Sequence, residues 1–302
     1  MIQPVPIPLT DTIAWLVIGL FLGGWAALGY DRNLARVATA SAWVVFGVFW
    51  LLLIPRFALA MKSPIETVLS ALAVPACLYA GYLLWQGRET LFTLSHAVAI
   101  MGVLYLPFTS IELLGRTLIE TVARQSHGMI LWAGFDAALV TEPETGYNSM
   151  LVFTDPTGHQ YVTHIVLQCT GIGSMSIFAG LIAAIDASTV RKVQALLMAV
   201  VVIYILNLIR NVFIAVAFGQ QWFQYFIDPV MTVTGFTDPG LVSFFIADRV
   251  ISQSASVVAL VGITLLTVRI VPELLSVVED AVYVVTRTEV DLHAAFATDG
   301  GR

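Results

Sequence analysis

Seven apolar segments, each close to the length that a helix needs to cross a lipid bilayer, dominate this sequence. They lie near residues 12–30, 36–54, 65–85, 91–108, 170–186, 193–218 and 249–270. A membrane-spanning helix requires about 20 predominantly apolar residues. Only 11% of the 302 residues are charged, whereas a soluble domain carries about 25%. The sequence therefore predicts a mainly α-helical, polytopic membrane protein with about seven transmembrane helices.

The segments between the apolar runs differ in kind. Charged residues recur at helical spacing within residues 109–129, which predicts an amphipathic helix at the membrane interface. The turn signal Asp155-Pro156-Thr157-Gly158 separates two runs of β-forming residues, at 150–154 and 159–168. Together with residues 130–140, these runs predict a small antiparallel β-sheet outside the bilayer.

These features divide the chain into four expected regions. N-terminal membrane helices and the amphipathic segment occupy residues 1–129, and the small outer β region occupies 130–168. Membrane helices that carry the candidate catalytic residues follow at 169–272, and a cytoplasmic C-terminal tail follows at 273–302. Within the first region, Gly19 and Gly23 have the small-xxx-small spacing that allows close helix packing.

The distribution of basic residues predicts how the chain is oriented, because Lys and Arg are enriched in cytoplasmic loops. With the N-terminus outside, the inner loops and tail receive Arg32, Arg36, Arg88, Arg191, Lys192, Arg269, Arg287 and Arg302. The outer loops receive Arg56, Lys62, Arg116 and Arg124. This orientation brings Cys169, Arg210 and Arg249 to one depth on the outer side of the membrane.

Composition and motifs exclude several functional classes. The formal net charge is −6 and no basic cluster occurs, which argues against a nucleic-acid partner. The sequence has no metal-ligand spacing and no glycine-rich phosphate loop, so we expect no metal and no other cofactor. Cys77 and Cys169 are expected at depths too different for a disulfide. We therefore expect two free thiols, with Cys77 packed among apolar neighbours.

Cys169 is the candidate nucleophile. It lies where a β-like run ends and an apolar helix begins. A cysteine attacks as the thiolate, and its free pKa of about 8.5 leaves little thiolate at neutral pH. A helix N-terminus and a nearby guanidinium would both favour the anion. Thr170 and Ser174, close to the helix start, supply small polar positions that would let a substrate backbone approach.

Arg210 and Arg249 each lie in an apolar segment, where a charge is expensive. Because arginine stays protonated, it can serve only as an electrostatic partner of a thiolate, an oxyanion or a substrate carboxylate or phosphate. Polar side chains on the same helix faces are expected to fix the arginine rotamers. They are Asn207 and Asn211 beside Arg210, and Gln253 beside Arg249.

Each candidate also has a structural interpretation. Cys169 alone would be a packing residue, and either arginine would be structural if it paired with Asp186 or Asp248. Arg249 would alternatively extend to the membrane interface. A Cys–His dyad with His164 is a further alternative, although a strand that continues to residue 168 would carry His164 outward.

The pattern resembles the exosortase/archaeosortase family, and in particular its archaeal type. The resemblance rests on Cys169-Thr170-Gly171 with Ser174, on Asn207 with Arg210-Asn211, and on Asp248-Arg249 with Gln253. It covers residues 164–255, whereas the first four apolar segments match only as generic hydrophobic spans. Many bacterial exosortases have histidine at the third position, where this chain has Arg249, and this difference favours the archaeal type.

The resemblance implies an enzyme that cleaves a C-terminal sorting signal of exported proteins. Such a signal consists of a short motif, a transmembrane helix and a basic tail. For the archaeal type the motif is Pro-Gly-Phe, and surface-layer glycoproteins are the expected substrates. The resemblance implies that Cys169 forms an acyl-enzyme, that Arg210 and Arg249 are its electrostatic partners, and that a membrane phospholipid amine is the acceptor. The active site is expected to face the outside of the cell membrane.

Two other functions remain open at this point. A membrane cysteine protease that only hydrolyses its substrate would use the same acyl-enzyme. A non-enzymatic transporter would use Arg210 and Arg249 to bind a lipid or an anion, with Cys169 incidental. The absence of repeated halves in the sequence disfavours the transporter.

Overall fold

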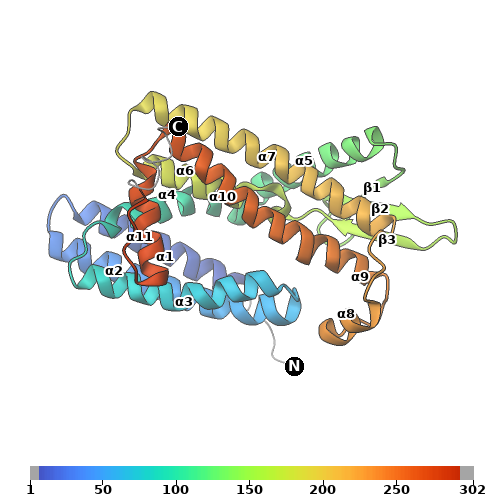
Figure 1. Cartoon of the computed structure of the whole chain (residues 1–302), viewed down its shortest axis with the longest axis horizontal. Coiled ribbons are helices and arrows are strands. Elements are labelled where there is room, and N and C mark those ends of the chain that lie inside the picture. The colour runs from blue at the N-terminus through green and yellow to red at the C-terminus, as the bar shows by residue number, and fades with distance from the viewer. Residues whose placement is uncertain (1–6, 293–302) are drawn as a thin grey trace. The chain divides into compact units, whose positions relative to one another are not determined.

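The computed structural model describes residues 7–292 and is mainly helical (Figure 1). Its α-helices are α1 (Ile7–Ala27), α2 (Arg32–Pro55), α3 (Pro64–Trp85), α4 (Leu91–Ser110), α5 (Glu112–Trp132), α6 (Ile172–Ala184), α7 (Thr189–Gly219), α8 (Ile227–Thr234), α9 (Leu241–Phe244), α10 (Gln253–Ile270) and α11 (Leu274–Thr286). Shorter elements are the π-helices η1 (Arg56–Ala60) and η3 (Phe245–Ser252) and the 3-10 helix η2 (Leu167–Thr170). The strands are β1 (Ala138–Thr141), β2 (Asn148–Thr154) and β3 (Gln160–His164). Residues 1–6 of the first expected region and 293–302 of the expected tail lie outside the described residues.

Within residues 7–292, six helices are long and apolar enough to cross a membrane. They are Leu9–Ala27, Arg32–Ala60, Pro64–Trp85, Leu91–Ser110, Thr189–Gly219 and Leu241–Ile270. A further apolar helix, α6, has 13 residues. It rises only about 20 Å, less than the roughly 30 Å of a bilayer core. The polytopic, mainly α-helical class is confirmed, with α6 shorter than the full span predicted for it.

The last long helix begins earlier than the apolar pattern indicates. It runs without interruption from Leu241 to Ile270, whereas the sequence pattern places its start near residue 249. The Asp238 carboxylate accepts a hydrogen bond from the Gly240 N–H at 2.8 Å, and this turn starts the helix. Arg249 therefore lies in the interior of the helix, and the prediction that Arg249 begins it is wrong.

Contacts divide the chain into two compact units. The first comprises Met1–Leu106, Ser176–Ala199 and Thr264–Arg302, and the second comprises Pro107–Met175 and Val200–Ile263. In the first unit, α2 packs against α1 and α3, and α11 packs against α3. The units are described separately below.

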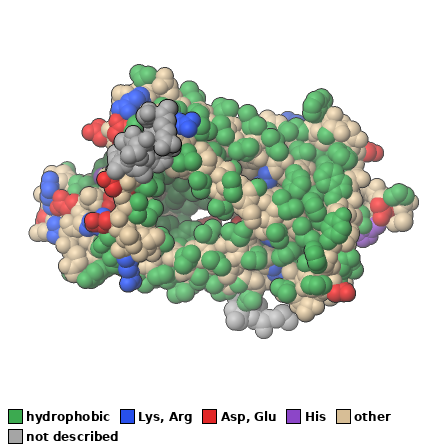
Figure 2. Space-filling view, viewed as in Figure 1, with side chains coloured by type: hydrophobic (Ala, Val, Ile, Leu, Met, Phe, Trp, Pro, Cys, Tyr) green, Lys and Arg blue, Asp and Glu red, His purple; other side chains and the backbone are tan. Residues whose placement is uncertain are grey.

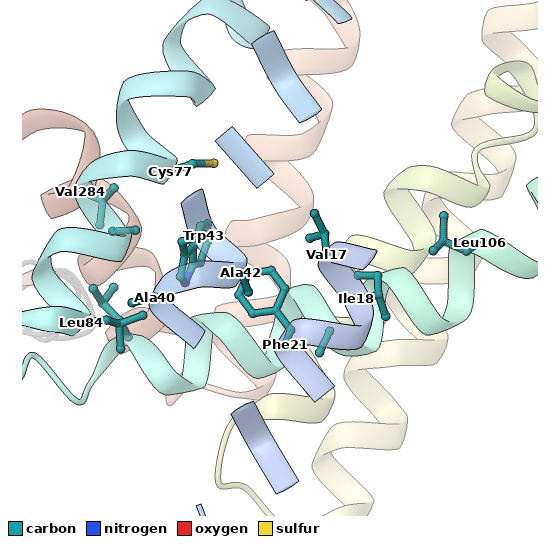
Figure 3. Packing of buried hydrophobic residues seen from close by; sticks show 13 residues of the cluster. Val17, Ile18, Phe21, Ala40, Ala42, Trp43, Cys77, Leu84, Leu106 and Val284 are labelled. Carbon is teal, nitrogen blue, oxygen red and sulfur yellow. The ribbon is translucent and has the colours of Figure 1, made fainter. Parts of the chain in front are cut away.

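The core of the first unit is aromatic and aliphatic. The rings of Phe21 and Trp43 meet edge to face, with centroids 5.3 Å apart (Figure 3). The Trp43 indole N–H donates to the Ser95 hydroxyl at 2.9 Å, which connects α2 to α4. Cys77 is buried in the same apolar cluster, and Cys77 and Cys169 are both free thiols, as predicted.

The packing face of α1 differs from the predicted one. Gly19 and Gly23 have no heavy atom within 4 Å of the position that a Cβ would take. Gly24 is buried against α2, where an added Cβ would clash with the Thr39 hydroxyl. The prediction for Gly19 and Gly23 is therefore wrong, because the buried stripe of α1 runs through Phe21 and Gly24.

Many large apolar side chains point away from the protein interior. Leu197 is 60% exposed and Val258 is 72% exposed, although both lie in long apolar helices. Hydrophobic side chains dominate the face drawn in Figure 2, and charged side chains are few on it. Helices with apolar side chains on the outside are expected where lipid is the solvent.

The second unit contains the β-sheet and α5. The three strands are antiparallel in the order β1-β2-β3, and α5 contacts β1 and β2 (Figure 1). Leu151 and Phe153 of β2 share a core with Val122 of α5 and Ala215 of α7. The predicted sheet and the predicted helix before it are confirmed. Their bounds differ, because residues 130–132 extend α5 and because β3 ends at His164.

Candidate active site

A tight turn between β3 and α6 holds Cys169. The chain leaves the sheet after His164 and forms η2, in which the Cys169 N–H donates to the Val166 carbonyl at 2.8 Å. This turn ends the extended backbone earlier than the β-forming residues up to 168 suggest. The Cys169 side chain is half-buried and packs against the core of the second unit.

The residues after Cys169 close the turn and start α6. The hydroxyl of the buried Thr170 donates to the Leu167 carbonyl at 2.7 Å. Gly171 has a φ of 77°, a conformation that glycine adopts without strain. Because α6 begins only at Ile172, Cys169 precedes the helix and does not occupy its first turn.

Two amides of α7 bind the backbone of the candidate nucleophile. The side-chain N–H groups of Asn207 and Asn211 both donate to the Cys169 carbonyl, and the bond from Asn211 is 2.7 Å long. Asn211 is only 2% exposed. We expected these amides to fix the Arg210 rotamer, and that expectation is wrong. Their position on α7 holds the turn that carries Cys169, and a Cβ on Gly171 would lie 3.3 Å from Asn207.

A single carboxylate bridges the two arginines. Arg210 donates to Asp248 Oδ1 at 2.6 Å, and Arg249 Nε lies 3.3 Å from Asp248 Oδ2. All three side chains are largely buried, with exposed fractions of 23% for Arg210, 15% for Arg249 and 10% for Asp248. The structure thus realises the Asp248 pairing, whereas Asp186 belongs to the other unit. From the sequence, we named Asp248 as a structural partner and as part of the family resemblance, but not as a candidate site residue, although its place beside Arg249 was the available signal.

The helix that carries Asp248 and Arg249 is locally widened. Both residues lie in the π-helical stretch η3, between α9 and α10. A π-helical segment changes the direction in which successive side chains leave the helix, and such segments occur often at functional sites. Here, the adjacent Asp248 and Arg249 side chains are joined by an ion pair.

The charges of this cluster act on the Cys169 thiol. Burial raises the pKa of Cys169 above its ordinary value, and Asp248 adds to this increase. A backbone hydrogen bond with Val166 and the positive charges of Arg210 and Arg249 lower the pKa, but they do not reverse the direction. Cys169 is therefore protonated at neutral pH in this state. The two guanidiniums favour the thiolate, as expected, but burial opposes them and the net direction of the pKa shift is upward.

The remaining candidates are Gln253, Ser174 and His164. Gln253 is 8% exposed and directly follows η3. Ser174 lies on the first turn of α6, where its side chain is half-buried. His164 Nδ1 lies 2.8 Å from Glu142 Oε1, and the His164 side chain is 48% exposed. The His164 ring is thus paired with Glu142 in this structure.

The arrangement can bind and stabilise an anion near Cys169, the candidate nucleophile. Two guanidiniums and one carboxylate leave a net positive charge, which attracts a further negative group. The Nε of Arg210 is buried and has no hydrogen-bond partner within residues 7–292. A buried donor of this kind is suited to an oxygen that becomes negative during a reaction.

Comparisons with known proteins agree on a family. Residues 9–238 match the family described as transmembrane exosortase (Exosortase_EpsH). Archaeosortase A of Haloferax volcanii is 50% identical over 301 residues, which cover 96% of this chain and 99% of that protein. Archaeosortase A of Natronomonas pharaonis is 47% identical over 294 residues, which cover 95% of this chain and 92% of that protein. No solved structure matches the chain. This chain belongs to the exosortase/archaeosortase family.

Proposed function

We propose that this protein is a membrane-embedded cysteine transpeptidase that cleaves a C-terminal sorting signal of exported surface proteins. The signal consists of a Pro-Gly-Phe motif, a transmembrane helix and a basic tail, and an S-layer glycoprotein is the expected substrate. The observation that carries the proposal is geometric. Helix α7 binds the Cys169 carbonyl through Asn207 and Asn211. The same helix carries Arg210, which shares the Asp248 carboxylate with Arg249 in one largely buried cluster. Family membership supports the same activity.

In the first half-reaction, Cys169 Sγ attacks the carbonyl carbon of the scissile peptide bond. The C–S bond forms and the C–N bond breaks, giving a thioester. The thiol proton ends on the leaving amine, which departs with the transmembrane helix of the signal. Arg210 and Arg249 stabilise the oxyanion of the tetrahedral intermediate. A single donor of this type contributes about 10²–10³-fold to kcat.

Activation of the thiol requires a change in its surroundings. Asp248 holds both guanidiniums in the resting state and itself raises the thiol pKa. If the entering carbonyl draws Arg210 towards itself and towards sulfur, the thiolate gains attraction and its pKa falls. In this sequence of events, the thiolate forms only when substrate is present. It also keeps the thiol protonated and unreactive when the site is empty.

In the second half-reaction, an amine of a membrane phospholipid attacks the thioester carbonyl. The new C–N bond replaces the C–S bond, and the amine proton returns to the sulfur. The surface protein is then attached to lipid and Cys169 is free for another cycle. If water attacks in place of the amine, the same intermediate gives a free carboxylate. The orientation predicted from the basic residues, with the N-terminus outside, would put this chemistry on the side where an exported substrate arrives.

The two cysteines provide a matched test. We expect Cys169→Ala to abolish processing of an S-layer glycoprotein that carries a Pro-Gly-Phe signal. Cys77→Ala, a change in the apolar core of the first unit, should leave processing intact. Processing is read from the mobility of the glycoprotein, with membrane levels of each variant measured in parallel. Normal processing by Cys169→Ala would remove the nucleophile and favour the anion- or lipid-binding transporter.

The acceptor is tested on the product of the wild-type reaction. The mass of the new C-terminal peptide distinguishes a lipid amide from a free carboxylate. A lipid amide supports transpeptidation. A free carboxylate as the only product would restrict the activity to hydrolysis by the same Cys169 acyl-enzyme.

A further inference from the structure

β3 forms one margin of the sheet, and within residues 7–292 it pairs with a strand on one side only (Figure 1). Two backbone hydrogen bonds, one at each end of the pairing between β2 and β3, define the hydrogen-bonding pattern between these strands. The Ile165 N–H donates to the Ser149 carbonyl at 2.9 Å, and the Asp155 N–H donates to the His159 carbonyl at 3.0 Å. In an antiparallel ladder, hydrogen-bonded pairs alternate with non-bonded pairs. The two bonds therefore fix which residues of β3 face β2.

The register identifies the backbone groups that face away from β2. Val152 is opposite Val162, and Met150 is opposite His164. Both pairs fall at non-bonded positions of the ladder, so the N–H and C=O of Val162 and His164 point outward. Among the residues that the structure describes, no hydrogen bond engages these outward groups. They recur about every 7 Å along the strand, which is the spacing of an extended peptide.

An open cleft of about 510 Å³ lies beside the first half of β3. One wall is the β2–β3 hairpin and includes His159 and Tyr161, and the other includes Gln221, Gln224 and Gly240. A Cβ on Gly240 would lie 3.4 Å from the Tyr161 ring. The cleft is rich in polar groups that can bond to a main chain. Its lining includes His159 and Tyr161 but neither Val162 nor His164, so the cleft lies at the hairpin end of β3 and not along the edge where these two residues direct their free backbone groups.

We propose that the substrate segment on the N-terminal side of the scissile bond adds to β3 as a fourth strand. This inference rests on the proposed function and specifies how the substrate is held. An extended main chain supplies alternating donors and acceptors that match a strand edge. The segment on the other side of the scissile bond leads into a transmembrane helix, whose backbone groups are already bonded within the helix.

Strand addition also delivers the scissile carbonyl to the nucleophile. His164 and Cys169 are five positions apart in the chain, which corresponds to at most about 18 Å of extended backbone. A peptide paired with Val162 and His164 therefore needs only a few further residues to reach Cys169. Because main-chain hydrogen bonds provide the affinity, we expect the enzyme to accept substrates with varied side chains upstream of the motif.

The sharpest test alters the substrate and leaves the enzyme unchanged. Synthetic substrates carry an ester in place of one backbone amide at successive positions upstream of Pro-Gly-Phe, which removes one N–H at a time. We expect kcat/KM to fall about fivefold to tenfold at alternate positions and little at the positions between them. Equal effects at all positions, or no effect at any, would overturn strand addition.

A change in the enzyme provides an independent test. Val162→Pro removes an outward N–H and spares the ladder to β2, since proline is tolerated on a strand edge when its N–H side is free. Val162→Ala is the matched control, because it shortens the side chain and keeps the N–H. We expect Val162→Pro to raise KM about fivefold or more with membrane levels and Cys169 alkylation unchanged. A wild-type KM in the proline variant would contradict the proposal.

The experiments distinguish failure of the proposed function from failure of strand addition alone. If wild-type enzyme does not cleave the unmodified substrate in a Cys169-dependent manner, the proposed function is wrong and strand addition falls with it. If cleavage depends on Cys169 but shows no alternation in the ester series, only strand addition is wrong.

Discussion

The Cys169 carbonyl allows the strongest test of how the site is held together. It accepts hydrogen bonds from both Asn207 and Asn211. Asn207→Ala or Asn211→Ala removes one hydrogen bond and leaves the other. Each change should therefore raise the activation free energy of processing by about 1 kcal/mol, which corresponds to a roughly fivefold loss of kcat/KM. The double variant leaves a part-buried carbonyl without either donor. That adds about 1–3 kcal/mol of desolvation penalty, so the double variant should lose more than the product of the two single losses.

The measurement is a double-mutant cycle on kcat/KM for processing. We expect a coupling energy of about 1–2 kcal/mol between Asn207 and Asn211, because they share one acceptor. Asn211→Ala combined with Cys77→Ala is the control pair and should be additive, because Cys77 belongs to the other unit and shares no partner with Asn211. If the Asn207–Asn211 pair is additive within about 0.5 kcal/mol, the shared carbonyl does not organise the site.

Three further predictions concern charge and backbone geometry at the site. Arg210→Lys and Arg249→Lys should each lower the processing rate about tenfold or more, because an ammonium cannot replace the planar donor fork; wild-type rates in both would refute the role of the arginines. Asp248→Asn removes a charge that raises the pKa of Cys169, so the thiolate fraction at pH 7 rises and alkylation by iodoacetamide should be faster. In the wild type, alkylation should speed up only as the pH approaches the raised thiol pKa, and an unchanged rate in Asp248→Asn would contradict this electrostatic account. Gly171→Ala places a side chain at a φ of 77° and should cost about 1–2 kcal/mol of stability, visible as a lower midpoint of thermal unfolding in detergent; an unchanged midpoint would show that the turn relaxes.

The membrane class and the hairpin could be predicted because their signals are local. A long apolar run specifies a helix, since lipid cannot satisfy free backbone groups. The turn at residues 155–158 is equally local, because the Asp155 carboxylate accepts hydrogen bonds from the Thr157 and His159 N–H groups. The bounds were less accurate. The start of the last long helix at Leu241 and the end of β3 at His164 depend on single turns that interrupt or extend the apolar pattern.

Apolar run length alone predicts that this chain enters a membrane, and Cys169, Arg210 and Arg249 stand out as chemically exceptional within their apolar surroundings. The tertiary structure decided which groups meet. Spacing along α7 shows that Asn207 and Asn211 share a helix face, but their common acceptor, the Cys169 carbonyl, lies 38 and 42 positions away in the chain. Arg210 and Asp248 are likewise 38 positions apart. Hydrogen bonds and ion pairs between such distant residues form only where helices have packed, and no local pattern encodes that packing.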